Sequence, residues 1–115
     1  MRYIALIYGN EALEAQQTDA QRQAVFDAYM AFGQDEQVRP TLLGGDALHP
    51  TSSATTVRVR DGKLMTTDGP FAETKEQLGG FYLIQAENLD QAIAVAAKIP
   101  GASTGSVEVR PIWEF

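Results

Sequence analysis

TDGPFAETKEQLGG, residues 67–80, lies between two strand-like runs and has an unusual composition for a simple connection. Asp68 and Gly69 indicate a tight turn, because glycine accepts a positive φ and aspartate can hydrogen-bond its own backbone. Pro70 fixes its own φ and keeps Gly69 out of the helical region. Phe71 then places a large apolar side chain where a loop is usually polar. A stiff turn, an apolar anchor and the charges that follow predict the wall of a pocket.

The residues before this stretch have the pattern of a β-hairpin. In TVRVR, residues 56–60, the valines alternate with the arginines, so each type occupies one face of a strand. Asp61 and Gly62 form a two-residue hairpin signal, and residues 63–67 are the predicted return strand. The hairpin therefore leads the chain directly into residues 67–80.

Strands and helices are also predicted on either side of the hairpin. Residues 3–8 and 81–84 are apolar on both faces, which is typical of central strands in a sheet. Residues 9–17 are a predicted polar loop, and residues 41–48 are a predicted strand with a kink at a glycine pair, Gly44 and Gly45. The first helix is predicted over 19–34. Thr18 and Gln21 are a predicted capping box, and the helical apolar face consists of Val25, Ala28, Tyr29 and Phe32.

A second helix and a last strand complete the pattern. Asn88 and Gln91 are a predicted cap, and Pro100 with Gly101 ends the helix. Its apolar face is predicted to consist of Leu89, Ala92, Ile93 and Ala96. Residues 107–115 place alternate apolar side chains on one face, as a strand does.

The order is therefore β-α-β, an inserted hairpin, and β-α-β, in a single domain over residues 1–115. Two such units predict an α+β fold of the ferredoxin-like split βαβ type, with both helices on one face of an antiparallel sheet. No segment is left to cover the other face, although the strands are apolar on both faces. We therefore expect a homodimer in which two sheets form a dimeric α/β barrel.

Composition excludes several classes of function. The chain has 115 residues, a formal net charge of −6 and a pI near 4.6, which argues against nucleic acid or an anionic membrane as partner. It has no cysteine and one histidine, so neither a metal site nor another cofactor is predicted. No apolar run approaches the length of a membrane span, and no signal-peptide pattern is present, so a cytoplasmic location is expected.

Asp68 and His49 are the candidate catalytic residues. Asp68, held by a Gly-Pro turn, could act as a base or orient a substrate, and it could equally cap nearby backbone N–H groups. His49 is the one side chain whose ordinary pKa suits acid–base chemistry near neutrality, and a solvated loop histidine is the alternative. The candidate substrate-binding residues are Phe71, Glu73, Lys75 and Tyr82. For the charged members of this group the alternative is a solvated rim, and for Tyr82 it is core packing.

The motif DGPFAETKEQLGGFYLI, residues 68–84, resembles the signature of the DGPF-domain branch of the YCII-related (YciI-like) family. The resemblance extends to residues 1–3, 44–48 and 105–112, and so over nearly the whole chain. It implies a dimeric α/β barrel of ferredoxin-like protomers. In a related branch, a dehydrochlorinase uses a proposed His–Asp pair whose histidine lies in the first helix. Here that helix has no histidine, only Asp27 and Tyr29 in the comparable region, so the pair cannot be carried over.

Two functions follow as hypotheses. The first is binding of a small organic molecule in a pocket of the barrel, with lyase-like or isomerase-like acid–base chemistry at Asp68. The second is a non-catalytic accessory or regulatory module, because the resemblance implies a link to extracytoplasmic-function sigma factors. The sequence does not decide whether the protein is an enzyme.

Overall fold

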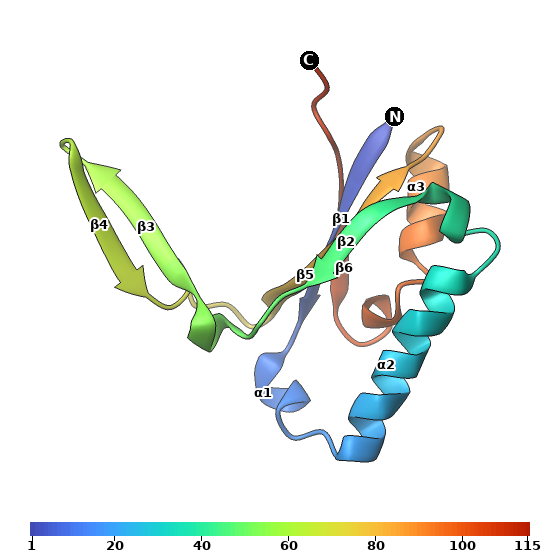
Figure 1. Cartoon of the computed structure of the whole chain (residues 1–115), viewed down its shortest axis with the longest axis horizontal. Helices are drawn as coiled ribbons and strands as arrows, with labels where there is room; N and C mark the ends of the chain where they lie inside the picture. The colour runs from blue at the N-terminus through green and yellow to red at the C-terminus, as the bar shows by residue number, and fades with distance from the viewer.

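The computed structural model describes all 115 residues and has an α+β fold built on a four-stranded antiparallel sheet (Figure 1). The strand order is β2-β5-β1-β6, so the two strands predicted to be central lie in the middle. Every neighbouring pair is antiparallel. The strands are β1 (Arg2–Gly9), β2 (Leu42–Ala47), β5 (Gln77–Gln85) and β6 (Ser106–Pro111).

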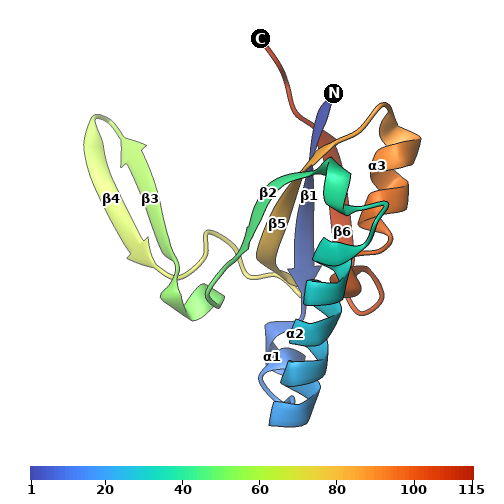
Figure 2. The same cartoon turned by 45° about the vertical axis from the view of Figure 1, so that its right-hand side comes forward.

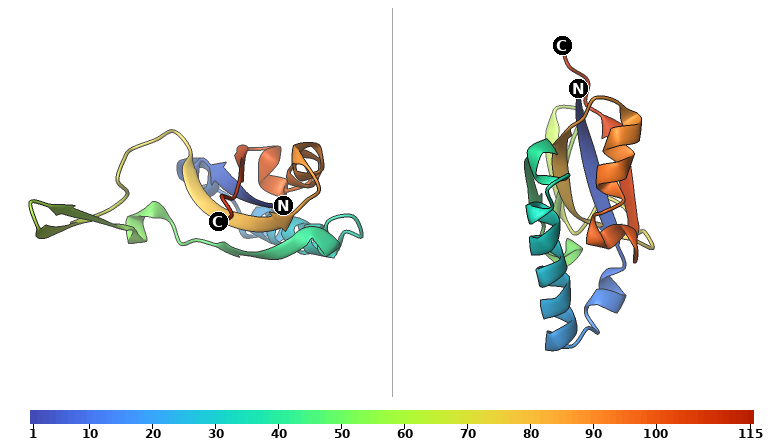
Figure 3. Two further views of the ribbon diagram at one scale, coloured as in Figure 1. Left: turned by 90° about the horizontal axis from the view of Figure 1, so that it is seen from above. Right: turned by 90° about the vertical axis from the view of Figure 1, so that its right-hand side faces the viewer.

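Two helices, α2 (Asp19–Gln34) and α3 (Leu89–Ala96), cover the same face of this sheet (Figures 2 and 3). The core lies between them and the sheet. Tyr3, Ala5 and Ile84 point to it from the central strands, and Ala92 and Ile99 are buried on the helical side. The apolar face predicted for α3 is partly wrong, because Leu89 and Ile93 are about half exposed and Val95 is buried with Ala92 and Ala96.

Helix α2 begins and ends where the sequence predicts. Thr18 caps it: its hydroxyl accepts a hydrogen bond from the Gln21 N–H, and the Gln21 side chain accepts one from the Thr18 N–H, at 3.1 and 2.8 Å. The predicted apolar face is covered only toward the C-terminus, where Phe32 is buried and Tyr29 half-buried. Val25 and Ala28 are exposed because the first turns of α2 extend past the end of the sheet (Figure 1).

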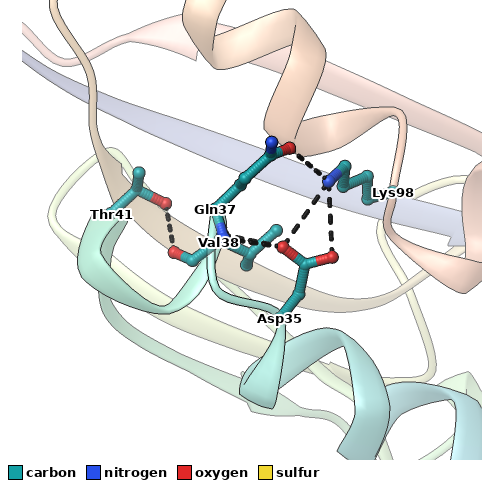
Figure 4. Close-up of polar contacts among 5 residues, drawn as sticks. All are labelled: Asp35, Gln37, Val38, Thr41 and Lys98. Carbon is teal, nitrogen blue, oxygen red and sulfur yellow. Dashed lines mark hydrogen bonds and ion pairs between the residues drawn. The ribbon is translucent and has the colours of Figure 1, made fainter.

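The end of α2 is tied to the end of α3 by one lysine (Figure 4). Lys98 Nζ lies 3.3 Å from Asp35 Oδ2 and donates to Gln37 Oε1 at 2.7 Å. Asp35 Oδ1 also accepts from the N–H groups of Gln37 and Val38, at 2.8 and 3.2 Å. The Gln37 N–H and the Lys98 ammonium lower the pKa of Asp35, although partial burial opposes them.

Asp35 should therefore make stability depend on pH in the acid range. Its pKa in the folded protein lies below the ordinary value of 3.8, so the ionised group stabilises the fold above that value. This contribution is lost as the pH falls through the folded-state pKa. We expect the urea midpoint to fall more between about pH 5 and pH 2.5 in the wild type than in Asp35→Asn. Asp27→Asn, on the exposed side of α2, is the control and should behave as the wild type. Equal pH dependence of the urea midpoint in all three proteins would refute the stabilising role of ionised Asp35.

The glycine pairs in β2 and β5 allow two strands to approach closely. The β2–β5 register shifts between Leu42 and Gly44, which confirms the predicted kink. A Cβ on Gly45 would lie 2.5 Å from the Phe81 carbonyl oxygen, and one on Gly80 would lie 2.9 Å from the Asp46 carbonyl oxygen. Strand β5 therefore begins at Gln77, four residues before the predicted start at residue 81, because its glycines belong to the pairing and do not interrupt it.

The predicted hairpin forms a separate two-stranded sheet of β3 (Thr55–Arg60) and β4 (Lys63–Asp68). Its turn residues Asp61 and Gly62 have φ of 53° and 72°, as a tight hairpin turn requires. The hairpin stands away from the main sheet (Figures 1 and 2). The radius of gyration is accordingly 16.0 Å, where about 13 Å is expected for a compact chain of this length.

The remaining elements are short. Asn10 caps helix α1 (Glu11–Glu14) by accepting from the Leu13 N–H, so the predicted loop over 9–17 is wrong in its first half. Three 3₁₀ turns connect the larger elements, and β6 ends at Pro111, so the predicted final strand is four residues too long. The turns are η1 (Arg39–Thr41), η2 (Thr51–Ser53) and η3 (Pro100–Ala102). None of the helices is long and apolar enough to cross a membrane.

Candidate functional site: the uncovered face of the sheet

The face of the main sheet opposite the helices is uncovered, and its side chains lie in two complete rows. Residues directly opposite each other on neighbouring strands share a face, so the pairing gives each row. Along β2, β5, β1 and β6 the rows are Gly44, Leu83, Ile4 and Arg110, and then Asp46, Phe81, Leu6 and Glu108. We call these eight residues the open face. It is apolar in the middle and charged at both edges.

The charged edges of the open face differ from each other. On β6, Arg110 Nε lies 3.8 Å from Glu108 Oε2, so these two groups form an exposed ion pair. On β2, Asp46 is exposed and forms no ion pair. Between the edges, the four apolar side chains Ile4, Leu6, Phe81 and Leu83 are only half-buried. The face can therefore take up an apolar body and offers both signs of charge at its margins.

Polar side chains meet at the end of the sheet next to the open face. Beyond a register shift in β1, Tyr8 lies opposite Leu78 and Ser106, and Ser106 Oγ is 2.8 Å from Glu76 Oε1. The loop that follows the hairpin thus reaches the sheet at Glu76. The sequence predicted a charged rim here but gave no indication of Ser106, which lies 30 residues further along the chain.

Glu11 joins three separate segments at the same end. Its N–H donates to Gln77 Oε1 at 3.0 Å, and its carboxylate accepts from the N–H and hydroxyl of Thr51 at 2.8 and 2.6 Å. These contacts hold α1, the turn η2 and the start of β5 together. No sequence signal identifies them, because the partners are 40 and 66 residues apart.

Two further titratable groups, Glu14 and Tyr29, lie near this network. Desolvation raises the pKa of the Glu14 carboxyl, and the neighbouring Glu11 carboxylate raises it further. Burial raises the pKa of the Tyr29 phenol, whose oxygen accepts a hydrogen bond from the Gly101 N–H at 3.2 Å. No group of three or more His, Asp or Glu side chains is arranged to hold a metal ion.

Asp68 lies at the end of β4, at the base of the hairpin and opposite Thr55. Gly69 holds this base: its N–H donates to the Ala54 carbonyl at 2.7 Å, and its carbonyl accepts from the Thr56 hydroxyl at 2.8 Å. Its φ of 102° is one that a residue with a side chain rarely adopts. The Asp68 carboxylate itself is exposed and makes no hydrogen bond within the protomer, so it does not cap the turn there.

No hydrogen bond or ion pair joins Asp68 to the other predicted site residues in one protomer. Phe71 is 80% exposed, and Glu73 and Lys75 on the same loop are also exposed. His49 follows β2 and is exposed without a hydrogen-bond partner. Tyr82 lies on the helical side of the sheet, where its ring centroid is 5.0 Å from that of Phe32. Burial, together with the neighbouring Tyr29, raises the pKa of Tyr82. Its neighbour Phe81 occupies the open face instead.

Comparison with known proteins gives the family. The model of the YCII-related domain matches residues 1–115, the full length of the chain. The chain belongs to the YCII-related family. An uncharacterized protein of Rhizobium meliloti (strain 1021) is 42% identical over 115 residues, covering 97% of this chain and 92% of that protein. The alignment with this relative therefore spans nearly the whole of the YCII-related chain.

Proposed function

We propose that two copies of this YCII-related protein pair through their open faces, as ferredoxin-like protomers of a dimeric α/β barrel. The observation that carries the proposal is the uncovered apolar middle of the sheet. Ile4, Leu6, Phe81 and Leu83 lie in the central strands, and an antiparallel sheet normally leaves a face to water only where that face is polar. A second sheet packed about 10 Å away would cover them without any further segment.

We propose further that the dimer binds a small aromatic or acidic organic molecule between the open faces. Phe81 and Leu6 would contact its apolar body, and Arg110 would balance an acidic group at the margin. Asp68, at the base of the hairpin beside this side of the sheet, would orient the molecule or accept a proton, with His49 and Lys75 assisting. The free carboxylate of Asp68 supports this role, because no hydrogen bond inside the protomer occupies it.

Asp68→Asn tests the ligand proposal. We expect this variant to bind a small aromatic carboxylate, selected from a panel by its thermal stabilisation of the wild type, at least about tenfold more weakly. Asp61→Asn, the same change at the far end of the hairpin, is the control and should bind as the wild type does. Isothermal titration calorimetry makes the comparison. Equal affinity in Asp68→Asn and the wild type would remove Asp68 from the proposed site.

The exposure of Asp68 and His49 favours an alternative function without catalysis. Neither Asp68 nor His49 contacts another titratable group by a hydrogen bond or ion pair, as an acid–base pair would. A non-catalytic accessory or regulatory module, with an extracytoplasmic-function sigma factor as its partner, would need no such pair. A pull-down with the purified sigma factor tests this alternative: specific capture supports it, and demonstrated turnover of a substrate without capture argues against it.

A further inference from the structure

The hairpin of β3 and β4, which we call the arm (residues 55–68), carries an uncompensated group of cations. The register places Arg60 directly opposite Lys63, and Arg58 lies two residues from Arg60 on the same face. None of the three forms a salt bridge within the chain. Like charges directly opposite each other destabilise a pair of strands, so this face lacks the carboxylates that would stabilise it.

The other face of the arm, which carries Thr66 and Asp68 nearer its base, is apolar toward the tip and equally without cover. Val57 and Val59 lie there with Leu64, which pairs with Val59. Their exposed fractions are 60%, 59% and 71%. An isolated two-stranded hairpin is at best marginally stable in water. Both faces of the arm therefore lack a partner in their own protomer.

The charge distribution of the chain identifies a fitting partner. The arm holds three of the nine Lys and Arg residues and two of the 15 Asp and Glu residues. The rest of the chain therefore has six cationic and 13 acidic residues, and is strongly acidic where the arm is basic. The surface of a second copy is thus complementary in charge to the arm.

The position of the arm brings it toward such a copy. The arm lies on the side of the main sheet opposite the helices, which is the side of the open face (Figures 1 and 3). A second protomer seated on the open face would stand next to the arm. In a twofold dimer each protomer would give one arm and receive one.

We propose that the arm packs on the second copy of this chain, with its valine face against apolar surface of that copy and its cations toward carboxylates at the margin. The proposal rests on the pairing of open faces proposed above and extends it. It also explains the place of Asp68 at the base of the arm: the contact would bring this carboxylate and the loop after it to the boundary between the two protomers.

The test reverses the charge of the arm in the full-length protein. Arg58→Glu combined with Arg60→Glu should weaken dimerisation at least about tenfold at low salt, measured by sedimentation equilibrium, and the loss should shrink as salt is added. Arg22→Glu combined with Arg39→Glu makes the same change of charge outside the arm and is the matched control. All four arginines are exposed, and circular dichroism checks that each variant folds.

Hydrogen exchange gives a second readout that needs no substitution. Amides of the arm should exchange at least about tenfold more slowly in the dimer than in a diluted, monomeric sample. The arm contact would be overturned if the arm variant dimerised with the same dissociation constant as the wild type and the arm amides exchanged equally fast in dimer and monomer. The pairing of open faces would remain intact in that case. A wild type that stays monomeric would overturn both.

Discussion

Leu6→Glu will leave the protein monomeric at concentrations at which the wild type is a dimer. Leu6 lies in the middle of the open face, between Phe81 on β5 and Glu108 on β6. In the proposed pair this position is buried in both protomers, so the substitution buries two carboxylates, each without a partner. An unpaired buried charge costs several kcal/mol. We therefore expect the dissociation constant to rise at least about a hundredfold, as measured by analytical ultracentrifugation.

Leu13→Glu is the matched control for this change. Leu13 is an exposed leucine on α1 and lies outside the open face, so the same substitution should leave the dissociation constant unchanged. Leu6 is half-buried in the single protomer, so the variant should keep its secondary structure. A Leu6→Glu protein that dimerises as tightly as the wild type would show that the open face is not the interface.

Ile84→Ala should produce the largest loss of folding stability. Ile84 is fully buried, and it lies opposite both Tyr3 and Leu42, at the centre of the core between sheet and helices. Removing its side chain takes away buried apolar surface and leaves a cavity, which together cost about 2–5 kcal/mol. Urea unfolding at one fixed protein concentration measures the loss in the free energy of unfolding.

Ile93→Ala is the control for the core substitution. Ile93 is on α3 and is 50% exposed, so the same change should cost well under half as much. If the two variants lose equal stability, the core is not where the structure places it.

The main elements could be predicted because each has a local signal. The capping box at Thr18 begins α2 at the expected residue, and the Asp61–Gly62 turn forms the hairpin with the expected positive φ values. The apolar runs over 3–8 and 81–84 became neighbouring central strands. Helix caps, two-residue turns and two-sided burial depend on residues close together in the chain, so the sequence displays them directly.

The departures arise from contacts between distant segments. The strand predicted over 81–84 begins earlier, and Gly80 is buried inside β5 because the β2 backbone passes so close that a side chain would not fit. Val25 was expected in the core, but it is exposed because the first turns of α2 extend past the end of the sheet. The alternation of a strand could assign Phe81 and Tyr82 to opposite faces, but not decide which face the helices cover.

The candidate site could be predicted only in part. The turn at Asp68 and Gly69 forms as expected and leaves the carboxylate free. The hydrogen bond from Ser106 to Glu76 and the contacts of Glu11 have no sequence signal, because they depend on how α1, the loops and β6 meet. Within one protomer no hydrogen bond or ion pair joins His49, Asp68 and Tyr82, and Tyr82 packs against Phe32 on the helical side of the sheet.

Sedimentation equilibrium of the unmodified protein tests the central claim most directly. The chain has a mass of 12.5 kDa, and pairing of the open faces predicts a species of twice that mass at micromolar concentration. A single species of 12.5 kDa at the same concentration would contradict the account, because the apolar middle of the open face would then remain exposed to water.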